Sequence, residues 1–186
     1  MRPSAGKRER LVASATDLLY RQGVERTTLA EIAAAADVPP GNVYYYFKSR
    51  DELVAAVIAA RTAEVRALLD SLDNRSSPTA RLKALARSWL DQSELIARHG
   101  CPIGTLTSEL NKHQHDPDDQ AARPFALILD WAQDQFRQLG RKDARELAIS
   151  LLSAVQGATL LANTFQDPDL MRGQVRRLER WIEALS

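Results

Sequence analysis

Apolar side chains recur along most of this chain at the three- and four-residue spacing of amphipathic helices. Leu11, Ala15, Leu18 and Leu19 fall on one face of an expected first helix, which Gly23 is placed to end. The sequence contains no run of strictly alternating apolar and polar residues, which would predict a strand. The pattern therefore predicts an all-α protein of about nine helices.

Two short helical segments between residues 27 and 53 predict a helix-turn-helix. Thr28, with Glu31 three residues later, forms a capping box that opens the second helix, whose body is mostly alanine. A turn follows at residues 37–38. The next two residues, Pro39 and Pro40, are prolines, which fit only the first turn of a helix, so they mark where the third helix begins.

Behind this motif the same periodicity predicts a larger helical body. A fourth helix is expected from Ser49 to about Leu72, and one continuous fifth helix across residues 82–96. Further stripes predict four more helices toward the C-terminus. We expect two domains, a DNA-binding domain at residues 1–50 and a ligand-binding and dimerisation domain at residues 51–186.

Composition changes this picture only locally. The formal net charge is +1, so the whole chain gives no basic signal for nucleic acid, although residues 1–50 carry a mild excess of Lys and Arg. A single cysteine, Cys101, excludes an intramolecular disulfide framework. The basic N-terminal segment leads into no apolar signal core, and no run of about 18 apolar residues occurs. We therefore expect a cytoplasmic protein without a membrane span.

Aromatic and basic residues gather at the end of the third predicted helix. Val43 and Phe47 are four residues apart and can anchor this helix on its neighbours, which leaves the tyrosines around the rest of it. A tyrosine can pack its ring on a sugar or a thymine methyl and bond to a phosphate through its hydroxyl. For Tyr44 we favour a DNA contact over a place in the core, whereas Tyr46 suits either role.

The candidate DNA contacts are Thr28, Pro40, Gly41, Asn42, Tyr44, Tyr45, Lys48 and Arg50. Asn42 lies near the start of the third helix, from which it can pair with adenine in the major groove. Lys48 and Arg50 suit phosphates, as do the Thr28 hydroxyl and the first amides of the second helix. For Thr28 the alternative is a helix cap with no DNA contact.

Residues 8–53 resemble the DNA-binding domain of the tetracycline-repressor (TetR) family of bacterial regulators. The resemblance is carried by the first helix ending at Gly23 and by the segments TTLAEIA and NVYYYFKSRDEL. The chain departs from the family pattern at residues 39–41, PPG, and at the short Ala30, because longer polar side chains often stand at these positions. The resemblance implies a ligand-responsive repressor that binds a palindromic operator as a homodimer.

The resemblance also implies that the helices after Leu53 bind a small effector and that the last two helices dimerise. Mostly apolar residues are candidates for an apolar or aromatic effector, namely Trp89, Cys101, Leu106, Leu110, Phe125, Leu129 and Gln156. Small and apolar residues of the last two helices are candidates for the dimer interface, namely Ser153, Gly157, Leu161, Val175, Leu178 and Ile182. For each of these residues, a place in the chain's own core is the alternative.

Other functions are weighed against a DNA-binding regulator. Cys101, at a Gly-Cys-Pro kink, suits a thiol sensor of electrophiles, although a free cysteine is more often a small buried hydrophobe. His113 and His115 are a weak metal signal, and we expect no metal and no other cofactor. We expect no enzyme, because no nucleophile–base pair and no phosphate-binding Gly loop is recognisable. A helical adaptor that binds protein through the tyrosine-rich face is the remaining alternative.

Overall fold

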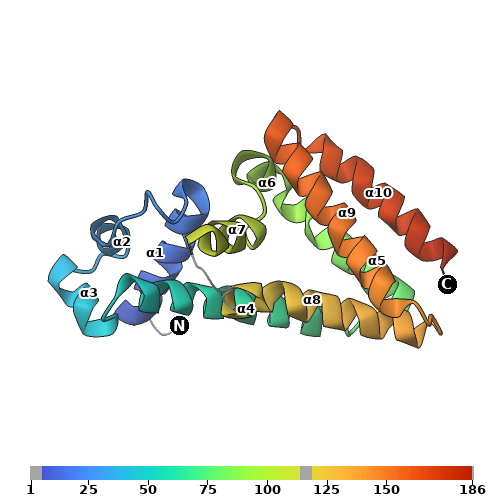
Figure 1. Cartoon of the computed structure of the whole chain (residues 1–186), viewed down its shortest axis with the longest axis horizontal. Coiled ribbons are helices and arrows are strands. Elements are labelled where there is room, and N and C mark those ends of the chain that lie inside the picture. The colour runs from blue at the N-terminus through green and yellow to red at the C-terminus, as the bar shows by residue number, and fades with distance from the viewer. Residues whose placement is uncertain (1–5, 114–118, 186) are drawn as a thin grey trace. The chain divides into compact units, whose positions relative to one another are not determined.

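Every regular element in the computed structural model, which describes residues 6–113 and 119–185, is a helix (Figure 1). The expected all-α class is confirmed. Over these residues the elements are α1 (Lys7–Gln22), α2 (Leu29–Ala35), α3 (Pro40–Tyr46), α4 (Arg50–Leu72), α5 (Pro78–Ser88), the 3₁₀ turn η1 (Leu90–Gln92), α6 (Ser93–His99), α7 (Gly104–His113), α8 (Asp119–Gln138), α9 (Ala144–Phe165) and α10 (Asp169–Ala184).

One continuous helix was expected across residues 82–96, and the structure divides it. Helix α5 ends at Ser88, η1 follows, and α6 begins at Ser93. A 3₁₀ turn has about 3.0 residues per turn instead of about 3.6, so it rotates the apolar stripe between the two helices. Leu85 of α5 and Ile96 of α6 are consequently both buried, and the periodicity alone does not reveal the break.

Local sequence signals set the ends of the first three helices, as expected. Gly23 ends α1 with a φ of 85°, a conformation that favours glycine. Thr28 caps α2: its hydroxyl oxygen accepts from the Glu31 N–H at 3.2 Å, and the Glu31 carboxylate accepts from the Thr28 N–H at 2.8 Å. Helix α3 begins at Pro40, and α4 spans Arg50–Leu72.

The chain divides into two compact units. The first comprises Met1–Ala63 with Thr105–Ala122, and the second comprises Glu64–Gly104 with Arg123–Ser186. Helices α4, α7 and α8 each contribute residues to both units. The first unit therefore extends beyond residue 50, and a functional boundary between residues 50 and 51 remains a prediction.

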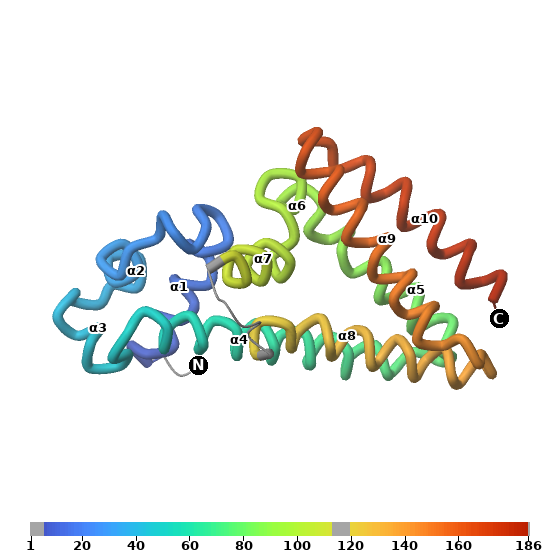
Figure 2. Tube along the Cα trace, viewed as in Figure 1, coloured from blue at the N-terminus to red at the C-terminus, as the bar shows by residue number. Residues whose placement is uncertain are grey.

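The first unit is built on one buried apolar cluster. Leu11 of α1, Ile32 of α2, Val43 of α3 and Leu53 of α4 are among its members. Figure 2 shows how the chain passes from α1 into the two short helices α2 and α3. Helices this short are marginal in isolation, so burial of their apolar sides in this cluster is what stabilises them.

The second unit has a core of its own, made by the end of α4 together with α5, α6, α8, α9 and α10. Phe136 of α8 is fully buried there, and its ring meets Trp181 of α10 edge-on with 5.9 Å between the ring centres. Leu82, Met171 and Ile182 are buried in the same cluster. Helix α10 is thus a structural part of this core.

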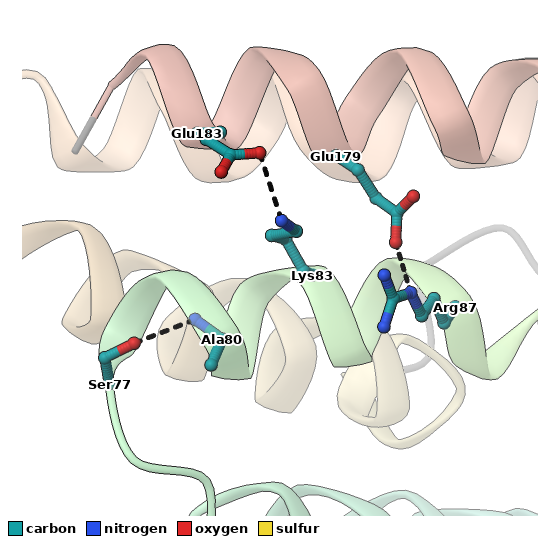
Figure 3. Close-up of polar contacts among 6 residues, drawn as sticks. All are labelled: Ser77, Ala80, Lys83, Arg87, Glu179 and Glu183. Atoms are coloured by element: carbon teal, nitrogen blue, oxygen red, sulfur yellow. Dashed lines mark hydrogen bonds and ion pairs between the residues drawn. The ribbon is translucent and has the colours of Figure 1, made fainter.

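Two ion pairs also join α10 to α5. Lys83 Nζ lies 3.2 Å from the Glu183 carboxylate, and Arg87 Nε bonds to the Glu179 carboxylate (Figure 3). Each pair has one well-exposed partner, so each contributes at most about 1 kcal/mol. The buried apolar side of α10 is therefore what holds it in place, and the ion pairs fix its register on α5.

Helix α9 is apolar on more than one side. By length and composition it is the one helix in the described part of the chain that could cross a membrane, and 39% of its most apolar window is buried within the chain. Leu151, Val155 and Ala162 form the buried side, while Leu160 and Phe165 are exposed. The buried side is that of a core helix, and the opposite side leaves large apolar residues exposed.

Candidate nucleic-acid interface

The turn between α2 and α3 is set by one residue in the left-handed region. Asp37 has a φ of 51°, which a short polar side chain tolerates better than a β-branched one. Its N–H donates to the Ala34 carbonyl at 3.1 Å, and its own carbonyl accepts from the Arg10 guanidinium at 3.1 Å. Val38, directly after the turn, is buried and directs the chain into α3.

Helix α3 has one buried side and one exposed side. Val43 and Phe47 are each only 1% exposed, and the Arg8 guanidinium covers the Phe47 ring at 5.0 Å. Because these two residues lie four apart, they turn the neighbouring side chains outward. Tyr44 is 60% exposed and Tyr45 is 76% exposed. The structure thus presents two adjacent tyrosine rings on the surface of the predicted recognition helix.

Tyr46 is half-buried, which is consistent with a place in the core, one of its two expected roles. It packs against the core of the first unit, and its ring meets that of Tyr45 edge-on with 5.1 Å between the ring centres. Tyr46 therefore supports the orientation of Tyr45. Pro40 and Gly41 are exposed at the start of α3, and Asn42 is partly buried beside them.

The two predicted phosphate contacts after α3 have different surroundings. Lys48 is exposed, and its ammonium donates to the Tyr44 carbonyl at 3.3 Å, close to the C-terminus of α3. The Arg50 guanidinium instead donates to the backbone carbonyls of Val24 and Thr27, in the loop between α1 and α2. These bonds compete with the phosphate contact that the sequence suggested for Arg50.

Thr28 acts as a helix cap in this structure. Besides the backbone bond to Glu31, its hydroxyl donates to the Glu31 carboxylate at 2.8 Å. The Thr28 backbone N–H and then its hydroxyl hold the pKa of Glu31 below its usual value. Glu31 is therefore an anion near the first amides of α2, so a phosphate has to approach those amides away from Glu31.

The seven predicted effector residues are divided between the two cores. Trp89, Phe125 and Leu129 belong to the core of the second unit, whereas Leu106 and Leu110 pack against that of the first. The other two are neighbours in the second unit. A Cβ placed on Gly104 would lie 3.1 Å from Gln156 Oε1 and 3.3 Å from the Cβ of Cys101, which is buried.

The second unit also has a groove of about 560 Å³ between the end of α4 and α5. Its walls combine the apolar Leu68 and Leu72 with the basic Arg75, Lys83 and Arg87. The last two of these cations already pair with carboxylates of α10 (Figure 3). None of the seven predicted effector residues lines this groove.

The predicted dimer residues fall into two groups, one exposed on α9 and one buried on α10. Ser153, Gly157 and Leu161 of α9 are exposed. Three residues of α10 are instead buried in the chain's own core, namely Val175, Leu178 and Ile182. The stripe on α10 looked like an interface because sequence periodicity shows that a helix side is apolar but does not show which surface covers it. A partner chain can meet α10 only on its other sides.

Two family models match the chain. Residues 11–57 match the model described as bacterial regulatory proteins of the tetR family. Residues 78–176 match the model of the C-terminal domain of LmrA/YxaF-like transcriptional regulators. The chain belongs to the TetR family.

Two transcriptional regulators and one solved structure align with more than half of this chain. The transcriptional regulator AcuR of Cereibacter sphaeroides is 29% identical over 187 residues, covering 91% of this chain and 82% of that protein. The transcriptional repressor DhaR of a Mycobacterium species is 28% identical over 105 residues, 56% of this chain and 52% of that protein. A crystal structure of a TetR regulator from Legionella pneumophila superposes with a TM-score of 0.83 at 25% identity, covering 99% and 98% of the two chains.

These matches settle the class of the protein. It is a helix-turn-helix transcriptional regulator of the TetR type, a family of ligand-responsive DNA-binding proteins, and the relatives named above are themselves regulators. The thiol-sensor alternative is not favoured, since Cys101 is only 5% exposed and a sensing thiolate needs access to solvent.

Some residues that shape the TetR-type interface were not found from the sequence. Arg10 supports the turn at Asp37, and Glu109 of α7 accepts a hydrogen bond from the Val24 N–H. The second contact joins residues 85 positions apart, and no local pattern signals it. Within the described ranges no group of three metal-ligating side chains occurs; the predicted weak metal loop, with His115, lies outside those ranges.

Asp37 offers a direct test of the turn. We expect Asp37→Val to lower the free energy of unfolding by about 1–2 kcal/mol, because a β-branched residue is strained at positive φ. Asp37→Gly removes that strain and should leave stability within about 0.5 kcal/mol of the starting protein or raise it. Urea unfolding of both variants measures the difference. Equal stabilities for the Val and Gly variants would contradict the assigned turn geometry.

Proposed function

We propose that this chain is a cytoplasmic repressor that binds a palindromic operator as a homodimer and is released by a small apolar or aromatic effector. The exposed pair Tyr44 and Tyr45 on α3 carries this proposal. Two adjacent rings that water surrounds are costly on a surface with no partner, and they suit the half-apolar wall of a DNA groove.

We propose a role on the DNA for the exposed residues of α3 and for Lys48, which follows it. With α3 in the major groove, Tyr44 and Tyr45 pack on sugars and thymine methyls and bond to phosphates through their hydroxyls. Asn42 reads a base edge near the start of the helix. Lys48 contacts a phosphate. The exposed Gly41 has no atom within 4 Å of a built Cβ, so its backbone is open to close approach by DNA.

The proposed dimer surface is the exposed side of α9. Ile149, Leu160, Leu161 and Phe165 are large apolar residues left exposed along this helix. The exposed small residues Ser153 and Gly157 lie between them in sequence and allow a second helix to come close. The same helix from a second protomer is the proposed cover, and the outer side of α10 borders the interface.

The effector is proposed to bind in the second unit. Trp89, Phe125 and Leu129 supply apolar surface there. Gln156 supplies a polar group, since its Nε2 atom is buried with no hydrogen-bond partner among the described residues. An aromatic effector that carries an acceptor oxygen would satisfy this donor, which is costly to leave unpaired. The effector must bind the operator-free state more tightly in order to release the DNA.

The DNA proposal is tested with the tyrosines and the lysine separately. Tyr44→Ala and Tyr45→Ala should each weaken operator binding by about 1–3 kcal/mol, because each removes a stacked ring and a phosphate bond. Lys48→Ala should weaken binding to operator and random duplex alike, and should lower the salt slope by about one unit. Fluorescence anisotropy with a labelled operator duplex at several salt concentrations measures both effects.

If the three variants fold and bind the operator as tightly as the starting protein, α3 is not the recognition helix. The tyrosine-rich face would then be open to the alternative role of an adaptor for another protein.

The dimer proposal is tested on α9. Leu161→Glu should shift the protein from dimer to monomer at micromolar concentration, because it places a charge in a desolvated interface. Operator affinity should fall with it, since two half-sites about 34–36 Å apart then have to be bound independently. Sedimentation velocity gives the mass, and Arg66→Gln on the exposed side of α4 is a control with the same change in charge. An intact Leu161→Glu dimer would move the interface elsewhere.

The effector proposal has a thermodynamic signature. Any compound that displaces this protein from its operator should bind the free protein more tightly than the operator complex, by the factor with which it weakens DNA binding. Gln156→Leu should reduce the affinity for compounds with an acceptor oxygen more than for their hydrocarbon analogues. Calorimetric titration with and without operator duplex measures this. Equal affinity in the two titrations would exclude release by that compound.

A further inference from the structure

The loop between α1 and α2, residues 23–28, is held on both sides by charged groups from distant parts of the chain. The Val24 N–H donates to Glu109 Oε2 of α7 at 2.6 Å. The Val24 carbonyl accepts from the Arg50 guanidinium of α4, which also reaches the Thr27 carbonyl at 3.1 Å. Hydrogen bonds to charged partners are among the stronger ones in proteins, so this loop has little freedom to move.

The loop is shaped to receive the Glu109 carboxylate. A Cβ placed on Gly23 would lie 3.0 Å from Glu109 Oε2 and 3.2 Å from Oε1, and Gly23 also has a φ of 85°. Thr27 closes the loop from inside, because its buried hydroxyl donates to the Gly23 carbonyl at 2.8 Å. Only glycine at position 23 combines this backbone conformation with so close an approach of the carboxylate.

The last residue of this loop is also the cap of α2. Thr28 is the capping residue, so the position of the loop determines where α2 starts. Helix α3 packs against α2 in the same core. A displacement of Val24 therefore shifts the start of α2. Because α3 packs on α2, it also shifts Tyr44 and Tyr45.

We propose that Glu109 is a positioning residue for operator binding: its carboxylate holds the loop at residues 23–28 in the place from which α2 and α3 start. This inference rests on the DNA-binding function proposed above. The carboxylate acts through geometry: its oxygen has to reach the Val24 N–H, and its charge alone does not suffice.

Three substitutions of Glu109 separate geometry from charge. Glu109→Gln keeps the length and an acceptor oxygen, Glu109→Asp keeps the charge but is one methylene too short, and Glu109→Ala keeps neither. We expect the Gln variant to bind the operator within about threefold of the starting protein, and the Asp and Ala variants to bind at least about tenfold more weakly. Asn111→Ala, exposed on the same helix, is the matched control.

Anisotropy with the operator duplex gives the affinities, and hydrogen exchange at residues 24–28 reports the loop. Faster exchange in the Asp and Ala variants, with unchanged exchange in the second-unit core, is the expected local effect. If the Glu109→Asp variant bound the operator like the starting protein while the Glu109→Gln variant bound it weakly, charge alone would matter and the proposal would be overturned. Equal operator affinity for all folded variants would overturn it as well. If the Glu109→Ala variant does not fold, the operator affinities of the Glu109→Gln and Glu109→Asp variants still decide between geometry and charge.

Failure of the starting protein itself to bind any operator duplex would refute the proposed function and not the role of Glu109.

Discussion

Burial of Val43 and Phe47 is the constraint on which the proposed DNA-binding surface depends. Helix α3 has seven residues and would not be stable alone, so it exists because these two side chains fill the core of the first unit. Because the two residues lie four apart on one side of the helix, their burial determines which side faces outward. The exposure of Tyr44 and Tyr45 is a consequence of packing on the opposite side of the helix, and it needs no separate cause.

Features that depend on neighbouring residues could be predicted from the sequence. The Thr28–Glu31 capping box, the Gly23 stop and the proline start of α3 are local, because each uses backbone geometry within about four residues. The break between α5 and α6 was missed, since η1 preserves the burial of both stripes across it. Long-range polar contacts were also missed: the Arg50 bonds to the α1–α2 loop carry no periodic signal.

The candidate dimer residues show a second feature that could not be predicted from the sequence, namely which surface covers an apolar helix side. Helices α9 and α10 both carry apolar stripes, and the sequence does not show which surface, if any, covers such a stripe. In the structure the stripe of α10 with Leu178 is covered by the chain itself, while Leu160 and Leu161 of α9 are left exposed. Packing of α10 on α5, with its ion pairs (Figure 3), is what distinguishes the two cases.

A regulator of this type has to hold its recognition helix rigidly and still let an effector alter it. A rigid core serves the first need, since well-packed residues such as Val43 do not yield to small forces. The second need requires a few contacts that switch between discrete arrangements. Hydrogen bonds from charged side chains to one loop, as at Val24, suit that need, because a shift of about 1 Å takes donor and acceptor out of hydrogen-bonding range. If Glu109 positions this loop as proposed, an apolar core and a polar loop together give a DNA-binding surface that is stiff and still responsive.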